Sequence, residues 1–332
     1  MNHRYLKAIT ITTVCMLLAG CFVRLIPTPG GKVIVESGNY PDCLAGETCD
    51  DIEISDLFFD EDFTAVPDEG FEFIRWVRAD RYFFGCRTDE TLRLYTSDLE
   101  GTKIEQYLFT DDVFFMQPLF RSTGPDIDYS TDFECDDITA PNLGAENWRA
   151  FLNIFEADGT TYVGGYDVSP APNGEQISNI AGRQGGPEQG RLHLNVFSNY
   201  ESAFNGINQH EQGQFVEVNV FQEFRLKAEN AGTYTLTFDA RLPEVAALTE
   251  PATAYAFVKV LDPGNGFLPV GEVATSNASD LGTEWETRKI VFELTEEVAG
   301  SGTILQFGFT SLATNFDGSG VLYDNVSFKI SE

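Results

Sequence analysis

Strict alternation of apolar and polar residues in the C-terminal half of the chain constrains its fold more than any other feature. In Thr233–Arg241 the apolar residues Tyr234, Leu236, Phe238 and Ala240 alternate with polar ones. The same period of two recurs in Gln214–Phe221, Lys289–Leu294 and Leu305–Phe309. Because successive side chains of a β-strand point to opposite faces, we expect these segments to be strands with one apolar face. Such strands bury their apolar faces by stacking two antiparallel sheets.

The N-terminal half carries shorter runs of β-branched and aromatic residues between turns rich in Gly, Asp and Pro. These runs are Lys32–Glu36, Glu72–Val77, Thr91–Thr96 and Ile104–Phe109. No stretch of this half keeps a helical period of 3.6 for three turns. The sequence therefore predicts an all-β protein, with a small disulfide-stapled β-domain followed by a β-sandwich of the jelly-roll type.

The chain of 332 residues is long enough for about two domains. Its last cysteine is Cys135, and turn residues follow it, among them Pro141, Asn142 and Gly144. We therefore expect a domain boundary there. The expected parts are a signal peptide at 1–20, a tether at 21–31, a first domain at 32–135, a linker at 136–147 and the sandwich at 148–332.

An excess of acidic residues excludes several kinds of partner. Lys and Arg number 21 whereas Asp and Glu number 52, which gives a net charge of −31. Nucleic-acid binders need a basic surface to meet phosphates, so we expect no nucleic-acid partner. The same charge disfavours anionic membrane surfaces and strongly anionic polymers.

The first twenty residues have the pattern of an export signal. Two basic residues precede the apolar stretch Ala8–Leu18, which is too short to cross a membrane as a helix. The stretch runs into Ala19-Gly20-Cys21, and this ending resembles the bacterial lipoprotein box. The resemblance implies cleavage before Cys21 and stable anchoring by several acyl chains on that cysteine. Because Phe22 rather than Asp follows, it also implies the outer membrane, at the cell surface or the periplasmic face. An ordinary signal peptide with an incidental cysteine is the alternative.

Four cysteines remain for the exported domains: Cys43, Cys49, Cys86 and Cys135. An even number of cysteines in an exported chain indicates disulfides, with three possible connectivities. We expect Cys43–Cys49, which brackets a turn-rich stretch, and Cys86–Cys135, which would tie the end of the first domain to its own core. A metal site is less favoured, because the chain has no Cys-x-x-Cys pair and no His near these cysteines.

The segment Pro67–Trp76 has the form Pro-x-x-Gly-Phe-x-Phe-x-x-Trp. It resembles a corner in a repeat of bacterial surface proteins, where two close cysteines often come first. The chain departs from that repeat directly after Trp76. Physically, Phe71, Phe73 and Trp76 are expected to fill the core of the first domain.

Three segments of the second half carry a further resemblance. They are the hairpin of Phe221–Phe224 and Gly232–Arg241, the stretch from Trp285 to the strand at Ile290, and the terminal strand Leu322–Phe328. In sequence and in order they are similar to jelly-roll carbohydrate-binding modules of families four, nine and twenty-two. The resemblance implies a polysaccharide partner, although this scaffold takes glucans, xylans or mannans in different proteins.

Two acidic residues fall on inward-facing positions of their expected strands. The inward set of Leu322–Ile330 includes Asp324, and that of Trp148–Glu156 includes Glu156. A buried carboxylate without a partner is costly. Because the first and last strands of a jelly roll are neighbours, these two residues predict a structural Ca²⁺ site of hard oxygen ligands, as related modules have. The alternative is that Asp324 caps a turn through backbone N–H groups.

Polar and aromatic residues on the outward positions of the sandwich strands are the candidate ligand site. A sugar ring offers an apolar face and hydroxyl groups, which aromatic, amide and carboxylate side chains bind. The candidates are His193, Asn195, Tyr200, Glu217, Asn219, Tyr255 and Lys259. The alternative is that the aromatic residues form a secondary core beneath loops.

Catalysis has little support in the sequence. Only His193 and His210 lie beyond the signal, which leaves few places for a nucleophile–histidine arrangement. The Glu-x-Asp-x-x-Glu strand of jelly-roll glucanases is absent. We therefore expect a non-enzymatic outer-membrane lipoprotein that binds a neutral polysaccharide. The alternatives are a structural or adhesive surface protein without glycan binding, and a cryptic glycosidase or lyase.

Overall fold

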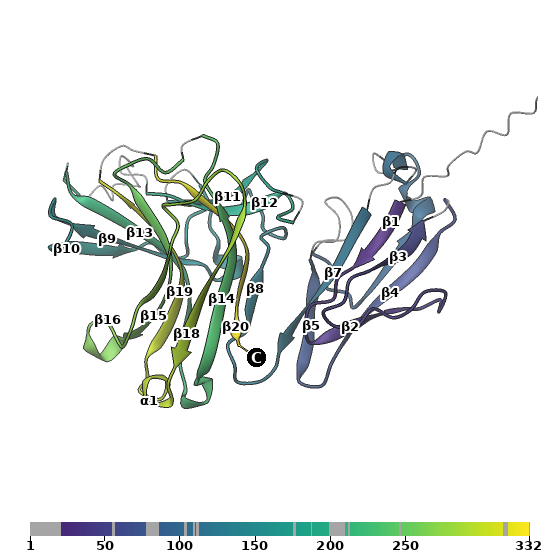
Figure 1. Ribbon diagram of the computed structural model, residues 1–332, viewed down its shortest axis with the longest axis horizontal. Helices are drawn as coiled ribbons and strands as arrows, with labels where there is room; N and C mark the ends of the chain where they lie inside the picture. The colour runs from purple at the N-terminus through teal and green to yellow at the C-terminus, as the bar shows by residue number, and fades with distance from the viewer. Residues whose placement is uncertain are drawn as a thin grey trace, which may run out of the picture.

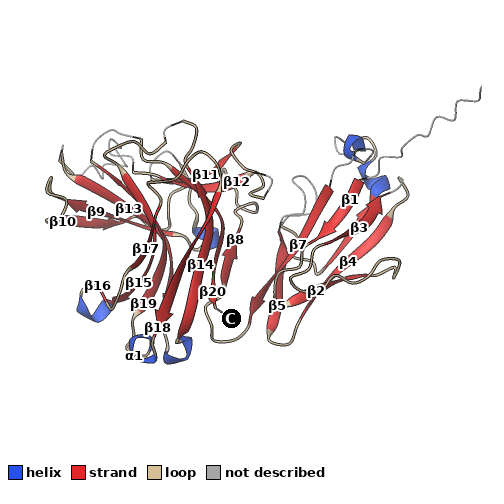
Figure 2. Cartoon of the chain, in the orientation of Figure 1, coloured by secondary structure: helices blue, strands red, loops and turns tan. Residues whose placement is uncertain are grey.

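The computed structural model describes residues 21–331 except 55–56, 78–85, 103–104, 109, 111–112, 175–176, 187, 199–209, 212, 246 and 315–317. Over these residues the chain forms strands β1 to β20 in two domains, joined by loops and very short helices (Figures 1 and 2). The prediction of an all-β protein is confirmed. No helix in this described part is long and apolar enough to span a membrane.

The first domain packs two sheets around one core. One sheet has the order β3 (Cys49–Ile54), β1 (Cys21–Leu25), β7 (Val113–Ser122) and β5 (Phe71–Val77). The other has the order β2 (Gly31–Val35), β4 (Asp60–Pro67) and β6 (Thr91–Tyr95). Trp76 is fully buried in the core, and Phe71 and Phe73 pack against it, as the sequence predicted.

The expected tether is wrong, because its first half is strand β1. This strand lies between β3 and β7 and runs parallel to β7. Cys21, Val23 and Leu25 are fully buried, whereas the residues between them are half-exposed. The segment therefore has the same period of two as the other strands. Pro27 and Pro29, two residues typical of an extended segment, lie beyond its end.

The second domain is a sandwich of two larger sheets. The seven-stranded sheet contains β10 (Tyr162–Asp167), β9 (Arg149–Phe155), β13 (Phe215–Arg225), β19 (Ile304–Ala313), β15 (Thr253–Asp262), β16 (Leu268–Pro269) and β17 (Ala274–Asn277). The six-stranded sheet contains β11 (Ser178–Gly182), β12 (Leu192–Val196), β20 (Val321–Ile330), β14 (Gly232–Arg241), β18 (Glu286–Leu294) and β8 (Tyr129–Thr131). Within the described residues the helical segments are η1 (Thr96–Leu99), η2 (Glu105–Tyr107), η3 (Gly144–Glu146), η4 (Ala228–Asn230), η5 (Pro263–Asn265) and α1 (Glu296–Ala299).

Aromatic rings join the two sheets of the sandwich across its core. Phe309 of β19 stacks on Tyr323 of β20 with 3.7 Å between ring centroids, and Phe307 stacks on Phe328 at 4.5 Å. The alternating apolar residues of β14 lie in the same core. The period of two thus predicted the strand β14 and its buried face correctly.

The second domain begins earlier than the sequence suggested. Strand β8 pairs with β20, and Ile127 and Phe133 belong to the sandwich core. The ring of Phe133 lies 5.9 Å from that of Trp148. Residues 127–135, assigned above to the first domain, therefore pack with the second. The segment assigned to a linker also contributes, because Leu143 is buried in the same core.

Both predicted disulfides, Cys43–Cys49 and Cys86–Cys135, are present. The first lies within the first domain. The second joins the two domains. The backbone amide of Cys86 donates to the carbonyl of Trp76 in the first domain at 2.7 Å, whereas Cys135 lies two residues after Phe133, which is buried in the sandwich core. The expectation that it closes the first domain on itself is therefore wrong.

We predict that the interdomain disulfide stabilises the chain more than the local one. Its cysteines are 49 residues apart, which gives about 4 kcal/mol in the chain-entropy account, against about 2 kcal/mol for the separation of 6 in Cys43–Cys49. Guanidinium unfolding of the Cys86→Ser/Cys135→Ser and Cys43→Ser/Cys49→Ser proteins measures both losses. A larger loss for the local pair would contradict the prediction.

Candidate functional site

The outward face of the seven-stranded sheet gathers polar and aromatic side chains from four neighbouring strands. We call the outward residues of β9, β13, β19 and β15 the platform. Directly opposed strand partners point to the same face of a sheet, so the pairing register defines the rows of the platform. The rows are Asn153–Glu217, Phe151–Asn219–Thr310–Tyr255, Arg149–Phe221–Gly308–Phe257 and Glu223–Gln306–Lys259.

Glu217 is the centre of a hydrogen-bonded network on the platform. One of its oxygens accepts from the side-chain amides of Asn153 at 2.8 Å and Asn219 at 2.9 Å, and the other accepts from the Tyr255 hydroxyl at 3.2 Å. Thr310 donates in turn to Asn219 at 2.8 Å. Burial and the nearby Glu217 carboxylate raise the pKa of Tyr255, so the hydroxyl keeps its proton. The network therefore holds a carboxylate and two amides in fixed positions.

A second network lies around Glu223, in the row of the platform farthest from Glu217. Glu223 accepts from the Arg149 guanidinium at 2.7 Å and from the Gln306 amide at 2.8 Å. Lys259 is the strand partner of Gln306, and its ammonium lies 4.4 Å from the ring centroid of Phe257. Burial lowers the pKa of Lys259, and Glu217 opposes that shift. Charge on the platform is thus balanced pair by pair.

Aromatic rings occupy the opposite end of the same face. Tyr162 of β10, Phe155 of β9 and Phe215 of β13 are directly opposed strand partners. The rings of Phe155 and Tyr162 pack edge to face at 5.8 Å, and Tyr162 is 56% exposed. The face therefore combines accessible aromatic surface with fixed amides and carboxylates, the groups that bind the apolar face and the hydroxyls of a sugar.

The structure brings together four of the seven predicted ligand residues: Glu217, Asn219, Tyr255 and Lys259. His193 and Asn195 are not among them, because their strand β12 belongs to the six-stranded sheet. Asn195 instead binds Asn179 at 3.1 Å. Tyr200 lies outside the described residues.

Sequence reasoning missed the contribution of β9 to the platform. Arg149, Phe151, Asn153 and Phe155 lie on its outward face. The signal was available, because these residues alternate with the buried set of the same strand. The prediction of a metal site rests on the buried set alone.

The predicted pairing of Glu156 with Asp324 does not form. Glu156 is exposed, follows the end of β9 and accepts from Gln214 at 3.4 Å. Strand β9 lies in the seven-stranded sheet, whereas Asp324 lies on β20 in the other sheet. The strand of Trp148–Glu156, taken above as the first of the sandwich, is therefore not a neighbour of the last strand; β8 takes that place.

Asp324 is fully buried, but on the outer side of its sheet rather than in the sandwich core. Its neighbour Tyr323 points into the core, as do Val326 and Phe328. Two successive inward positions are thus three residues apart. The cause is a bulge, where the register against β14 shifts and Asn325 adopts a positive φ of 46°. An inserted residue reverses the alternation, which a count by twos along the sequence does not detect.

Other acidic residues lie close to Asp324. The Asn325 amide donates to one Asp324 oxygen at 2.7 Å, while the other oxygen is buried without a hydrogen-bond partner. Burial raises the pKa of Asp324 well above its usual value, and Asp132, Glu134 and Asp239 raise it further. The carboxyl therefore takes a proton, or needs a cation to stay ionised.

Two of the carboxylates near Asp324 have hydrogen-bond donors of their own. Asp239, the strand partner of Asp324, accepts from Gln189 and Asn325 at 2.7 Å each. Glu134 accepts from the backbone amides of Arg191 and Leu192. Among the residues that the structure describes, no three His, Cys, Asp or Glu side chains converge in a metal-binding arrangement. The acids lie close together, but not as a preformed cage.

His193 is also buried on this outer side. Neither ring nitrogen has a hydrogen-bond partner, and the ring packs edge to face on Trp285 at 5.8 Å. Burial, with the nearby Arg241 guanidinium, lowers the pKa of His193 to about 4. The imidazole is therefore neutral at physiological pH and does not belong to an exposed ligand face.

Comparisons with known proteins give likeness of shape only. Searches of protein families and of curated proteins give no match. A carbohydrate-binding module solved with β-1,4-galactotriose, TmCBM61, is 12% identical over 57% of this chain and 92% of its own, with a TM-score of 0.30. A CBM22-2 xylan-binding domain from Paenibacillus barcinonensis Xyn10C is 14% identical over 61% and 99%, at 0.32. A Stig cyclase from Fischerella sp. is 17% identical over 62% and 98%, at 0.34.

Proposed function

We propose that this protein binds a neutral polysaccharide on the platform without transforming it. The observation that carries the proposal is the Glu217 network, in which three donors fix one half-buried carboxylate on the outward face of the seven-stranded sheet. Ligand sites gain affinity from groups that need no reordering on binding. The aromatic row beside the network supplies an apolar surface for sugar C–H groups.

Charge on the platform favours an uncharged ligand. Arg149 is already paired with Glu223, and Lys259 is offset by Glu217. The chain as a whole carries a net charge of −31, which repels acidic polymers. Hydroxyl groups, by contrast, bind to ion pairs without separating them, because guanidinium and carboxylate groups keep spare donors and acceptors.

The arrangement of the two platform carboxylates supports binding rather than glycosidic hydrolysis. A hydrolase needs one carboxyl group that donates a proton and a second that acts as base or nucleophile. Glu217 and Glu223 instead each accept hydrogen bonds from at least two donors. An adhesive or structural role remains the competing function, and a glycosidase or lyase is the third.

Replacing Glu217 should weaken glycan binding without unfolding the sandwich. Hydrogen bonds to charged groups contribute about 1.5–3 kcal/mol each, so Glu217→Ala should raise the Kd at least about tenfold. A glycan array identifies the ligand and calorimetry measures the Kd. Glu293→Ala, an exposed change on the other sheet, is the matched control. Absence of any glycan ligand would favour the adhesive function, and release of reducing sugar would favour an enzyme.

We further propose that Asp324 holds a structural calcium ion. Support comes from its buried oxygen without a hydrogen-bond partner and from the neighbouring Glu134 and Asp132 carboxylates. Calcium takes six to eight oxygen ligands in flexible geometry, so backbone carbonyls or water would complete the set. Glu156 is not part of this proposal, since it is exposed on the other sheet. Bound calcium would keep Asp324 ionised and fasten the segment that carries Asp132 and Glu134 to β20.

Calcium should raise the melting temperature through Asp324. In chelator, the raised pKa of Asp324 means that stability falls as pH rises above the unfolded value of about 3.9 and through the folded one. Added calcium should reverse this fall, by about 2.7 kcal/mol at a hundredfold excess over Kd. Asp324→Asn should remove both effects, whereas Glu156→Gln should keep them. A calcium response that survives Asp324→Asn would contradict the site.

Anchoring to the outer membrane through Cys21 is also a proposal. It is supported by the lipoprotein-box resemblance of residues 18–21. The buried position of Cys21, opposite Ile54 of β3, sets a condition on it. A diacylglyceryl group cannot fit within a packed core. Lipidation therefore requires the first residue of β1 to leave the sheet.

Labelled palmitate should enter the wild-type protein, and Cys21→Ser should abolish the label. The measurement is made on cells, followed by fractionation of inner and outer membranes. Cys15→Ser, which changes a cysteine within the expected signal, is the control that should keep the label. Label in the Cys21→Ser protein would contradict the anchor.

A further inference from the structure

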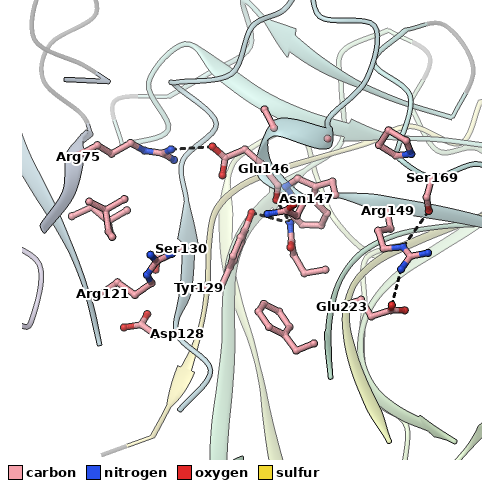
Figure 3. A pocket seen from close by; sticks show the side chains of 18 of the residues that line it. Arg75, Arg121, Asp128, Tyr129, Ser130, Glu146, Asn147, Arg149, Ser169 and Glu223 are labelled. Carbon is pink, nitrogen blue, oxygen red and sulfur yellow. Dashed lines mark hydrogen bonds and ion pairs between the residues drawn. The ribbon is translucent and has the colours of Figure 1, made fainter. Parts of the chain in front are cut away.

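A cavity of about 720 Å³ lies where the two domains meet (Figure 3). Strands β5 and β7 of the first domain line one side, with Arg75 on β5. Strand β8, helix η3 and the adjoining ends of β9 and β13 line the other, with Glu146 on η3. Ligand sites have volumes of about 300–1,000 Å³, so the cavity has the size of one.

Charged side chains in this cavity are balanced, unlike those of the chain. Its lining contains three guanidinium and three carboxylate groups: Arg75, Arg121, Arg149, Asp128, Glu146 and Glu223. The whole chain has 21 basic against 52 acidic residues. The cavity therefore concentrates guanidinium groups in an acidic protein.

These guanidinium groups are already neutralised by carboxylates. Arg75 of the first domain pairs with Glu146 of the second at 2.9 Å, and both side chains are more than four-fifths buried. Arg149 pairs with Glu223 at 2.7 Å. An anionic ligand would have to separate such pairs and enter the field of a strongly acidic chain. The cavity therefore disfavours carboxylate and phosphate ligands.

Uncharged hydroxyl groups meet no such obstacle. A guanidinium group has five N–H donors, and a carboxylate has about four acceptor positions, so a paired arginine and glutamate still present both kinds of site. The Nε atom of Arg75 is buried without a hydrogen-bond partner. Leu119, Pro170 and Phe224 supply apolar lining beside these groups. Alternating polar and apolar surface of this kind suits a sugar unit.

We propose that the interdomain cavity is a second binding site, which takes a short segment of an uncharged oligosaccharide. It shares only the Arg149–Glu223 pair with the platform and does not include the Glu217 network. Because Arg75 and Glu146 come from different domains, an occupied cavity also fastens the two domains together. The two sites thus allow one protein to hold two glycan segments at once.

Calorimetric titration of the full chain with β-1,4-linked hexaoses of glucose, xylose and mannose tests the proposal. The hexaose that binds should do so with two molecules per chain. Ala145 is exposed at the cavity wall, so Ala145→Trp should fill the cavity and reduce the ratio to one. Ala228→Trp, an exposed change on η4 outside the lining, should leave it at two. Glu217→Ala should retain the cavity site.

A second cavity variant tests the proposal in case Ala145→Trp does not fold. Arg75→Gln/Glu146→Gln keeps a neutral hydrogen bond across the domains but removes the ion pair, and should weaken the cavity site at least about tenfold. If the wild-type protein binds one hexaose per chain and Glu217→Ala abolishes that binding, the cavity is not a binding site and the platform is the site. A ratio that neither cavity variant alters, or preferential binding of hexagalacturonic acid there, would also overturn it. Binding of no hexaose would overturn both sites.

Discussion

Burial of the Phe133 ring in the sandwich core is the contact on which the arrangement of the chain depends. The ring packs against Trp148, and its backbone adopts a positive φ of 56° to reach that position. Residues next to Phe133 in the chain make three different interactions. Strand β8 joins the six-stranded sheet, Glu134 accepts a hydrogen bond from the backbone amide of Leu192 at the start of β12, and Cys135 forms the covalent link to the first domain. One buried ring thus places a strand, an acid and the interdomain disulfide together.

Local periodicity predicts a strand well where one side of it is buried throughout. Strand β14 is such a case, since every second residue from Tyr234 to Ala240 lies in the core. The same reasoning failed at β20, because the bulge at Asn325 reverses the faces and has no clear sequence signature. It also missed β1, whose five residues are too few to stand out before two prolines.

The residues of the candidate site also differ in whether the sequence could predict them. Glu217, Asn219, Tyr255 and Lys259 were predictable, because parity within long strands places them on an outward face. Their separation from His193 was not, since the sheet that a strand joins depends on pairing with distant segments. Networks such as that of Glu217 depend on the register between strands, which no local pattern in a single sequence specifies.

The position of β1 bears on how the protein would stand on a membrane. A lipid attached at Cys21 would be followed at once by a strand that lies between two others, with no flexible spacer. The first domain would then lie close against the bilayer with little freedom to pivot. With the disulfide and the Arg75–Glu146 pair fastening the second domain to the first, the platform would be presented at a set height and angle. Such a protein would hold its platform in one orientation relative to the membrane instead of letting it move on a flexible linker.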